Sequence, residues 1–218
     1  MCGIAGFLGD FVPPLLDSMG DRIAHRGPDD HSSLYIAEQR VGLCHRRLSI
    51  IDLSPMGRQP MQDRAGRVAI VFNGEIYNYR ELRADLESRG FQFETQTDTE
   101  VLLMLYRAEG TAMLGRLNGM FAFAIWDRSR DCLFLARDGF GVKPLYYCET
   151  PKGFLFASEI KALTAEASVS RDLDFDAIDH YVRYLWCPHP RTMLKAVKKL
   201  PPGTAMLVQR GKILKSWT

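Results

Sequence analysis

The residues best suited to chemistry stand at the N-terminus, where the chain opens with Met1-Cys2-Gly3. Cys2 has a small side chain, so we expect Met1 to be removed, which would give one residue both a thiol and a free α-amine. An α-amine titrates near pH ~8 and can accept a proton from a thiol, whose own pKa is about 8.5. The sequence therefore predicts that Cys2 is a nucleophile that carries its own base. The simpler alternative is an ordinary small residue after the start codon.

A nucleophile that attacks a carbonyl carbon needs fixed hydrogen-bond donors for the oxyanion that develops. Asn73 and Gly74 follow the apolar, strand-like run 68–72, and glycine lets a backbone N–H approach a ligand closely. This pair is therefore a candidate oxyanion hole. The alternative is a plain turn that ends the strand, because Asn-Gly is a very common turn dipeptide.

Three charged residues could recognise a substrate with a charged head group. Arg47 can bind a carboxylate through its two-pronged guanidinium, and Glu75 and Asp98 can bind an ammonium. Each also has a simpler explanation, since Asp98 could only cap a helix and Arg47 could be a solvated loop charge. The spacing of the histidines does not support a Cys–His pair.

The composition is that of a soluble globular chain with one domain, or one domain and an appendage. The chain has 218 residues, of which 46% are hydrophobic and 25% charged. A net charge of +2 gives no reason to expect nucleic acid or a membrane surface as partner, and no apolar run reaches transmembrane length. We expect no secretory leader. Five scattered cysteines without a CxxC pair argue against zinc and disulfides and favour the cytoplasm.

The expected elements run from a β-rich part through helices to a second β-rich part. Capping boxes are predicted at Asn78 with Glu81 and at Thr97 with Glu100, and a long loop at 53–66. Neighbouring apolar strands favour two antiparallel sheets stacked face to face with helices outside, an α+β fold. The strands are expected at 4–8, 33–38, 41–45, 68–72, 91–94, 120–126, 132–136, 145–148, 153–157 and 205–209, and the helices at 15–23, 78–90, 97–110, 158–165 and 175–185.

Eight segments together resemble the glutaminase domain of the glutamine-hydrolysing asparagine synthetases. These enzymes are class II glutamine amidotransferases within the N-terminal-nucleophile hydrolases. The resemblance covers about residues 1–165, and PPG at 201–203 continues it. The segments, in the order of the family, are MCGIAGF (1–7), HRGPDD (25–30), HRRLSIIDLS (45–54), FNGEIYNYRELR (72–83), TDTEVLL (97–103), GMFAFAIWD (119–127), ARDGFGVKPLYY (136–147) and ASEIKAL (157–163).

The resemblance implies a four-layer αββα sandwich and a defined set of site residues. Cys2 would be the terminal nucleophile, with its α-amine as base, directly or through a water. The Asn73 side chain and the Gly74 N–H would form the oxyanion hole. The substrate would be L-glutamine, hydrolysed to glutamate and ammonia through a thioester. Its α-carboxylate would bind Arg47, its α-ammonium Glu75 and Asp98, and the pocket would be lined by the backbone of Leu48, Ser49, Ile50 and Ile51.

The family also has an ATP-dependent synthetase domain with a Ser-Gly-Gly-x-Asp-Ser loop, which this sequence does not contain. We expect an amidotransferase domain at 1–170 and a connecting segment at 171–218. No cofactor or metal is expected for this part, whereas ATP and Mg would be needed in the synthetase domain. We favour a fragment of a longer synthetase over a stand-alone glutaminase that serves a partner in trans, and a homodimer is left open.

Three functions remain in view. The first is ammonia supply for the amidation of aspartate to asparagine. The second is amidation of another carboxylate, for instance in antibiotic or cell-surface polysaccharide biosynthesis. The third is a non-catalytic interaction module, which the presence of Cys2, Asn73 and Asp98 disfavours.

Overall fold

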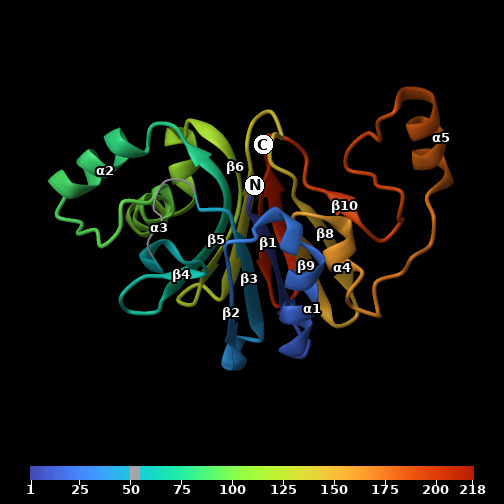
Figure 1. Cartoon of the computed structure of the whole chain (residues 1–218), viewed down its shortest axis with the longest axis horizontal. Helices are drawn as coiled ribbons and strands as arrows, with labels where there is room; N and C mark the ends of the chain where they lie inside the picture. The colour runs from blue at the N-terminus through green and yellow to red at the C-terminus, as the bar shows by residue number, and fades with distance from the viewer. Residues whose placement is uncertain (50–54) are drawn as a thin grey trace.

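Two antiparallel β-sheets form the centre of the molecule in the computed structural model, which describes residues 1–49 and 55–218 (Figure 1). Within these ranges each sheet has six strands. The first sheet has the order β10 (Lys198–Lys199), β8 (Tyr146–Thr150), β9 (Gly153–Ala157), β1 (Gly3–Gly9), β3 (Val41–Arg47) and β2 (Asp30–Ile36). The second has the order β12 (Lys212–Trp217), β11 (Ala205–Gln209), β7 (Cys132–Arg137), β6 (Gly119–Asp127), β5 (Val68–Ile76) and β4 (Met61–Gln62).

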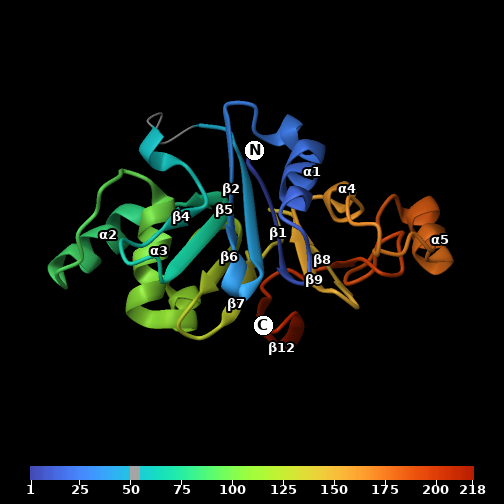
Figure 2. The same cartoon turned by 90° about the horizontal axis from the view of Figure 1, so that it is seen from below.

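Helices cover the outer face of each sheet, so the molecule has four layers (Figures 1 and 2). The helices α1 (Pro14–Arg22) and α4 (Ile160–Leu163) pack on the first sheet, and α2 (Tyr79–Ser88) and α3 (Asp98–Glu109) on the second. Helix α5 (Phe175–Tyr184) stands outside these layers. Short 3₁₀ segments lie at Ala24–Arg26, Ala37–Gln39, Pro55–Gly57 and Gly110–Arg116. The arrangement confirms the predicted α+β fold and its αββα layers.

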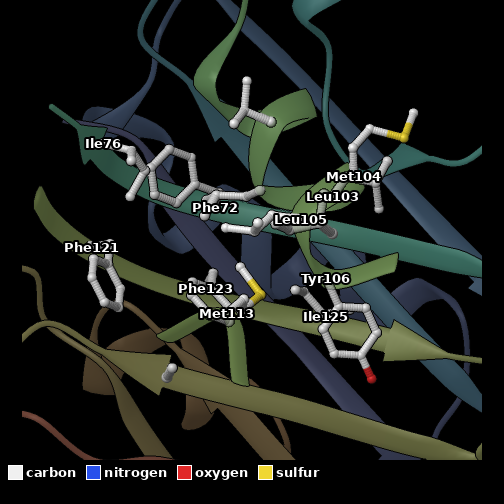
Figure 3. Packing of buried hydrophobic residues seen from close by; sticks show 14 of the residues in the cluster. Phe72, Ile76, Leu103, Met104, Leu105, Tyr106, Met113, Phe121, Phe123 and Ile125 are labelled. Carbon is white, nitrogen blue, oxygen red and sulfur yellow. The ribbon is translucent and has the colours of Figure 1, made fainter. Parts of the chain in front are cut away.

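The central strands are apolar on both faces because both faces are buried. On β5 and β6, alternate side chains point to the other sheet or to the helices, as the two-residue period of a strand requires. Most residues that face the other sheet are small, with Trp126 as the exception, and large ones face α3 (Figure 3). The inner set is Ala69, Val71, Ala122 and Ala124, and the outer set is Ile70, Phe72, Phe123 and Ile125.

Strand β1 places Cys2 at one end of the first sheet. The strand lies between β3 and β9, pairing Ile4 with His45 and Ala5 with Ala157. Its side chains enter two cores, because Ile4 faces the second sheet while Ala5 packs under α1. The residue just before β1 is therefore fixed by a strand that is buried on both faces.

Several predicted elements differ from the observed ones because tertiary contacts decide them. Strand β5 continues to Ile76, so Asn73 and Gly74 lie inside a strand, and the strand-ending turn was wrong. No strand forms at 91–94. Strand β4 lies within the predicted loop, and β12 was missed. The predicted strand 205–209 is confirmed.

One predicted capping box was wrong and the other holds in part. The side chain of Asn78 does not cap α2, because it binds the backbone of Arg116 and Asn118 instead. Thr97 does cap α3, accepting the Glu100 N–H at 3.2 Å. The Glu100 carboxylate turns away to the N–H groups of Glu94 and Thr95. In both cases, backbone groups outside the helix bind a side chain that a capping box would use at the helix start.

The loop between β7 and β8 is built around the fully buried Asp138. Its carboxylate accepts four backbone N–H groups at 2.9–3.2 Å, those of Phe121, Phe140, Val142 and Lys143. The neighbouring Arg137 guanidinium donates to the Lys143 carbonyl at 2.7 Å. These contacts hold the loop against β6, where it forms part of the cavity described below.

We predict that Asp138→Ala lowers the free energy of unfolding by about 4 kcal/mol, because it leaves two buried and two partly buried backbone donors without an acceptor. Urea unfolding measures the change. The control is Asp10→Ala, whose exposed carboxylate should contribute less than about 0.5 kcal/mol. A loss below about 1 kcal/mol for Asp138→Ala would contradict this role.

Candidate active site

A cavity of about 240 Å³ brings together most of the residues that the sequence singled out. It opens between the start of β1, the end of β3, the last part of β5 and the start of α3. Ser49 does not line it and donates its N–H to Asp29 at 2.8 Å instead. Ile50 and Ile51 lie outside the described residues. The lining residues are Met1, Cys2, Arg47, Leu48, Gly57, Gln59, Phe72, Asn73, Gly74, Glu75, Thr97, Asp98, Thr99, Met120 and Lys143.

The Cys2 thiol lies against the backbone of Leu48. The Leu48 N–H donates to Sγ at 3.4 Å, and Sγ lies 3.6 Å from the Leu48 carbonyl oxygen. Burial raises the pKa of the thiol, and the Leu48 N–H, the terminal ammonium and Arg47 only partly offset this. The thiol is therefore mostly protonated at neutral pH and needs a base before it can attack.

A network of buried polar groups fixes the backbone at Cys2. The Arg26 guanidinium donates to the Cys2 carbonyl at 2.9 Å and to Glu159 at 2.9 Å. Two residues further along, the Ile4 carbonyl accepts the Ser158 N–H, and the Ile4 N–H donates to the Ser158 hydroxyl. The nucleophile is thus held by the β9–α4 junction as well as by its own strand.

Asn73 is buried, and its side-chain amide nitrogen has no hydrogen-bond partner within the described part of the chain. An unpaired buried donor is costly and rare in folded proteins, so it points to a missing acceptor. Gly74 follows it at a position where any side chain would collide with the Met120 carbonyl oxygen across the sheet. Asn73 and Gly74 therefore offer hydrogen-bond donors, and Gly74 adds no side chain, in the cavity that Cys2 also lines.

The backbone edge of β5 shows where the Gly74 N–H points. Strand N–H groups alternate in direction, so those of Phe72, Gly74 and Ile76 share one edge. The Phe72 N–H donates to the Gln59 side chain at 2.7 Å, and the Ile76 N–H donates to Asp98 at 3.1 Å. The Gly74 N–H therefore lies between two backbone N–H groups that bind side chains, on the edge of β5 that faces away from β6.

Arg47 ends β3 and is largely buried. Its guanidinium lies so close to Gly57 that a methyl group added there would collide with it, and Thr97 closes the same space. The loop around Gly57 therefore holds the Arg47 side chain in one direction within the cavity.

Asp98 is the first residue of α3 and is almost fully buried. Burial raises its pKa to about 6, and the negative charge of nearby Glu75 adds to the rise, while N–H groups of Ile76 and Thr99 lower it. A raised carboxyl pKa beside a second carboxylate is the signature of a site that lacks a cation. A ligand ammonium would supply one.

His45 is not a partner of the nucleophile, in agreement with the sequence. Its Nε2–H donates to the Phe72 carbonyl at 3.1 Å, which joins the two sheets next to Asn73. Burial lowers the pKa of its ring to about 4, so the ring is neutral.

Besides Met1, seven cavity residues were not singled out as site residues from the sequence: Gly57, Gln59, Phe72, Thr97, Thr99, Met120 and Lys143. Gln59 and Gly57 belong to the predicted loop 53–66. The length of that loop indicated a function, but it did not indicate which of its residues take part. Met120 and Lys143 lie in two of the quoted segments, where only their position in the fold shows that they reach the cavity.

Within residues 1–49 and 55–218, no cluster of histidine, cysteine, aspartate and glutamate could hold a metal ion. No helix in the same ranges is long and apolar enough to cross a membrane.

The chain belongs to the glutamine amidotransferase domain family, whose model matches residues 1–217.

Its curated relatives include asparagine synthetase [glutamine-hydrolyzing] 1 of Bacillus subtilis, 41% identical over 216 residues, which cover 96% of this chain and 34% of the relative. A putative asparagine synthetase [glutamine-hydrolyzing] 2 of Methanocaldococcus jannaschii is 37% identical over a match that covers 92% of this chain and 42% of the relative. Amidase chry2 of Gibberella zeae is 41% identical, with 76% and 26% covered. The chain thus spans about a third of the length of the relatives it matches.

Solved structures show the same fold at low identity. The glutamine phosphoribosylpyrophosphate amidotransferase of B. subtilis, complexed with ADP and GMP, aligns with a TM-score of 0.72 at 20% identity over 99% of this chain and 49% of its own. A structure described as the allosteric regulatory enzyme of purine biosynthesis aligns with a TM-score of 0.74 at 18% identity, over 100% and 48%.

The raised pKa of Asp98 predicts a pH-dependent loss of stability. Between about pH 4 and 6 the folded state binds more protons at Asp98 than the unfolded chain does, so the free energy of unfolding falls as pH rises. We expect Asp98→Asn to remove this pH dependence. The free energy of unfolding of the variant minus that of the wild type should therefore be larger by roughly 2–3 kcal/mol at pH 7 than at pH 4. Urea unfolding across this range is the measurement, with the exposed Glu149→Gln as control. A constant difference across the range would contradict the assignment.

Proposed function

We propose that this chain hydrolyses L-glutamine to glutamate and ammonia, with Cys2 as nucleophile. The observation that carries the proposal is the unpaired amide nitrogen of buried Asn73 in the cavity that Cys2 lines. A donor fixed there before the reaction is what an oxyanion needs, because no reorganisation is then required when charge develops.

In the first half-reaction the thiol of Cys2 passes its proton to the residue's own α-amine, which removal of Met1 exposes. The sulfur attacks the side-chain carbonyl carbon of glutamine, and the oxygen of that carbonyl becomes an oxyanion held by Asn73 Nδ2 and the Gly74 N–H. The α-ammonium then returns the proton to the amide nitrogen. The C–N bond breaks, ammonia leaves, and a thioester remains.

In the second half-reaction water attacks the thioester carbonyl. The α-amine removes a proton from the water, and the same two donors hold the second oxyanion. The C–S bond breaks, the thiol regains the proton, and glutamate is released. The raised pKa of the Cys2 thiol supports the need for a base in the first half-reaction.

The charges of the cavity suit the head group of a free amino acid. Arg47 would bind the α-carboxylate, since it is held in one direction by Gly57. Asp98 and Glu75 would bind the α-ammonium, whose positive charge would offset the burial and the nearby Glu75 charge that raise the pKa of Asp98. Leu48 keeps its lining role in this proposal, together with Ile50 and Ile51, whereas Ser49 is left out because it does not line the cavity.

The ammonia would be passed to a synthetase region that makes asparagine from aspartate with ATP and Mg, in the cytoplasm. The names of the B. subtilis relatives support this, and about two-thirds of their length lies outside the match. Exposed apolar residues on and after α5, Phe175, Val182, Leu185 and Trp186, support a partner region. This domain would need no cofactor of its own.

A second acceptor class has one observation in its favour. Amidase chry2 of Gibberella zeae is as similar to this chain as the first B. subtilis relative, and its name is not that of an asparagine synthetase. Ammonia for a carboxylate other than aspartate is therefore the alternative, with the same chemistry in this domain.

We predict that Asn73→Ala lowers kcat for glutamate release about 100- to 1000-fold with little change in KM, because it removes a donor used only by the oxyanion. Cys2→Ala should abolish turnover. Asn118→Ala serves as matched control, since Asn118 does not line the cavity and uses its backbone N–H for its contact with Asn78. Full activity of Cys2→Ala would refute the proposed function, and a loss below about threefold for Asn73→Ala would refute the oxyanion role.

We predict that Gly57→Ala raises KM for glutamine at least about tenfold while kcat changes little, because the added methyl group displaces the Arg47 guanidinium and weakens carboxylate binding. Gly115→Ala is the matched control, since an added methyl group meets no atom within 4 Å there. Equal KM values for the two variants would show that Arg47 does not bind the substrate.

A further inference from the structure

Lys143 places a cation without a counterion in the lining of the cavity. The residue is only 6% exposed, and its ammonium makes no hydrogen bond or ion pair anywhere in the described ranges of the chain. The nitrogen is not among the fully buried side-chain atoms of those ranges, so the ammonium faces the open space of the cavity, where a ligand would meet it.

Backbone contacts fix Lys143 on one side of the cavity. Its N–H is bound by Asp138, whose carboxylate also binds the N–H of Phe121. Phe121 pairs directly with Gly74 in the register of β6 and β5. Lys143 therefore reaches the cavity from the β6 side of the Asn73–Gly74 segment.

The other charged groups of the cavity approach from the opposite edge of β5. Asp98 binds the Ile76 N–H on the edge that faces away from β6, and Arg47 lies against Gly57 and Thr97 beside α3. Glu75 is close enough to Asp98 to affect it electrostatically. The head group of an amino acid would thus lie at one end of the cavity, and Lys143 would face the other end.

We propose that Lys143 supplies positive charge to the acyl end of the glutamine site. There it stabilises the oxyanion of both tetrahedral intermediates and the γ-carboxylate of the glutamate product, neither of which exists in neutral substrate. This inference rests on the proposed glutaminase function. The effect needs no direct hydrogen bond, because a charge acts over several ångströms in a cavity that holds little water.

This role separates activity from stability. A lysine kept for structure would be paired, and its removal would lower the melting temperature. An ammonium that faces only the cavity contributes little to folding, so its removal should slow the reaction and leave the melting temperature nearly unchanged.

The test compares Lys143→Met with Lys143→Arg and with Lys212→Met, which makes the same change on the exposed edge strand β12. For Lys143→Met we expect kcat to fall about tenfold and the inhibition constant of glutamate to rise about fivefold to tenfold, with KM for glutamine within about twofold. The melting temperature should stay within about 2 °C of that of the wild type. Lys143→Arg should retain most of the activity, and Lys212→Met should match wild type.

Wild-type kcat and glutamate inhibition in Lys143→Met would overturn the inference, as would a lower melting temperature. If the wild type turns over glutamine and Lys143→Met is equally active, only the role of Lys143 fails. If the wild type releases no glutamate, the proposed function fails and the inference falls with it.

Discussion

The site depends on the face-to-face packing of two sheets. Cys2 belongs to the first sheet and Asn73 to the second, so the nucleophile and the proposed oxyanion donor meet only because the sheets stack. Small residues on the inner faces, such as Ala122 and Ala124, let the sheets approach closely. The His45 ring adds a direct bond between the sheets beside Asn73. Core packing therefore sets the geometry of the chemistry.

The cavity holds several groups in states that the fold alone would not favour. The Asn73 amide nitrogen lacks an acceptor within the described residues, and the pKa of Asp98 is raised to about 6. Lys143 adds to the lining a cation that has no counterion among those residues, and the pKa of the Cys2 thiol is also raised. A zwitterionic amino acid with a reactive side-chain carbonyl would satisfy these groups together. Stability given up at one site is the expected cost of pre-organisation for binding and catalysis.

Local pattern and resemblance predicted the layers of the fold and the residues that gather at the cavity. The paired apolar runs were sufficient for two sheets, because continuous apolar strands need burial on both faces. What the sequence could not predict depends on distant partners. Asn78 was read as a cap, but it binds a segment about forty residues away. Gly57 and Lys143 reach the cavity only through the folded positions of Arg47 and Asp138.

The central claim is that Cys2 attacks glutamine with the help of its own α-amine. The most direct measurement compares glutamate release by the chain that begins at Cys2 with release by the chain that retains Met1, with the intact mass of each sample recorded. The mechanism predicts steady release from the first and loss of activity in the second, because a peptide bond removes the base. Equal rates from both forms would contradict it.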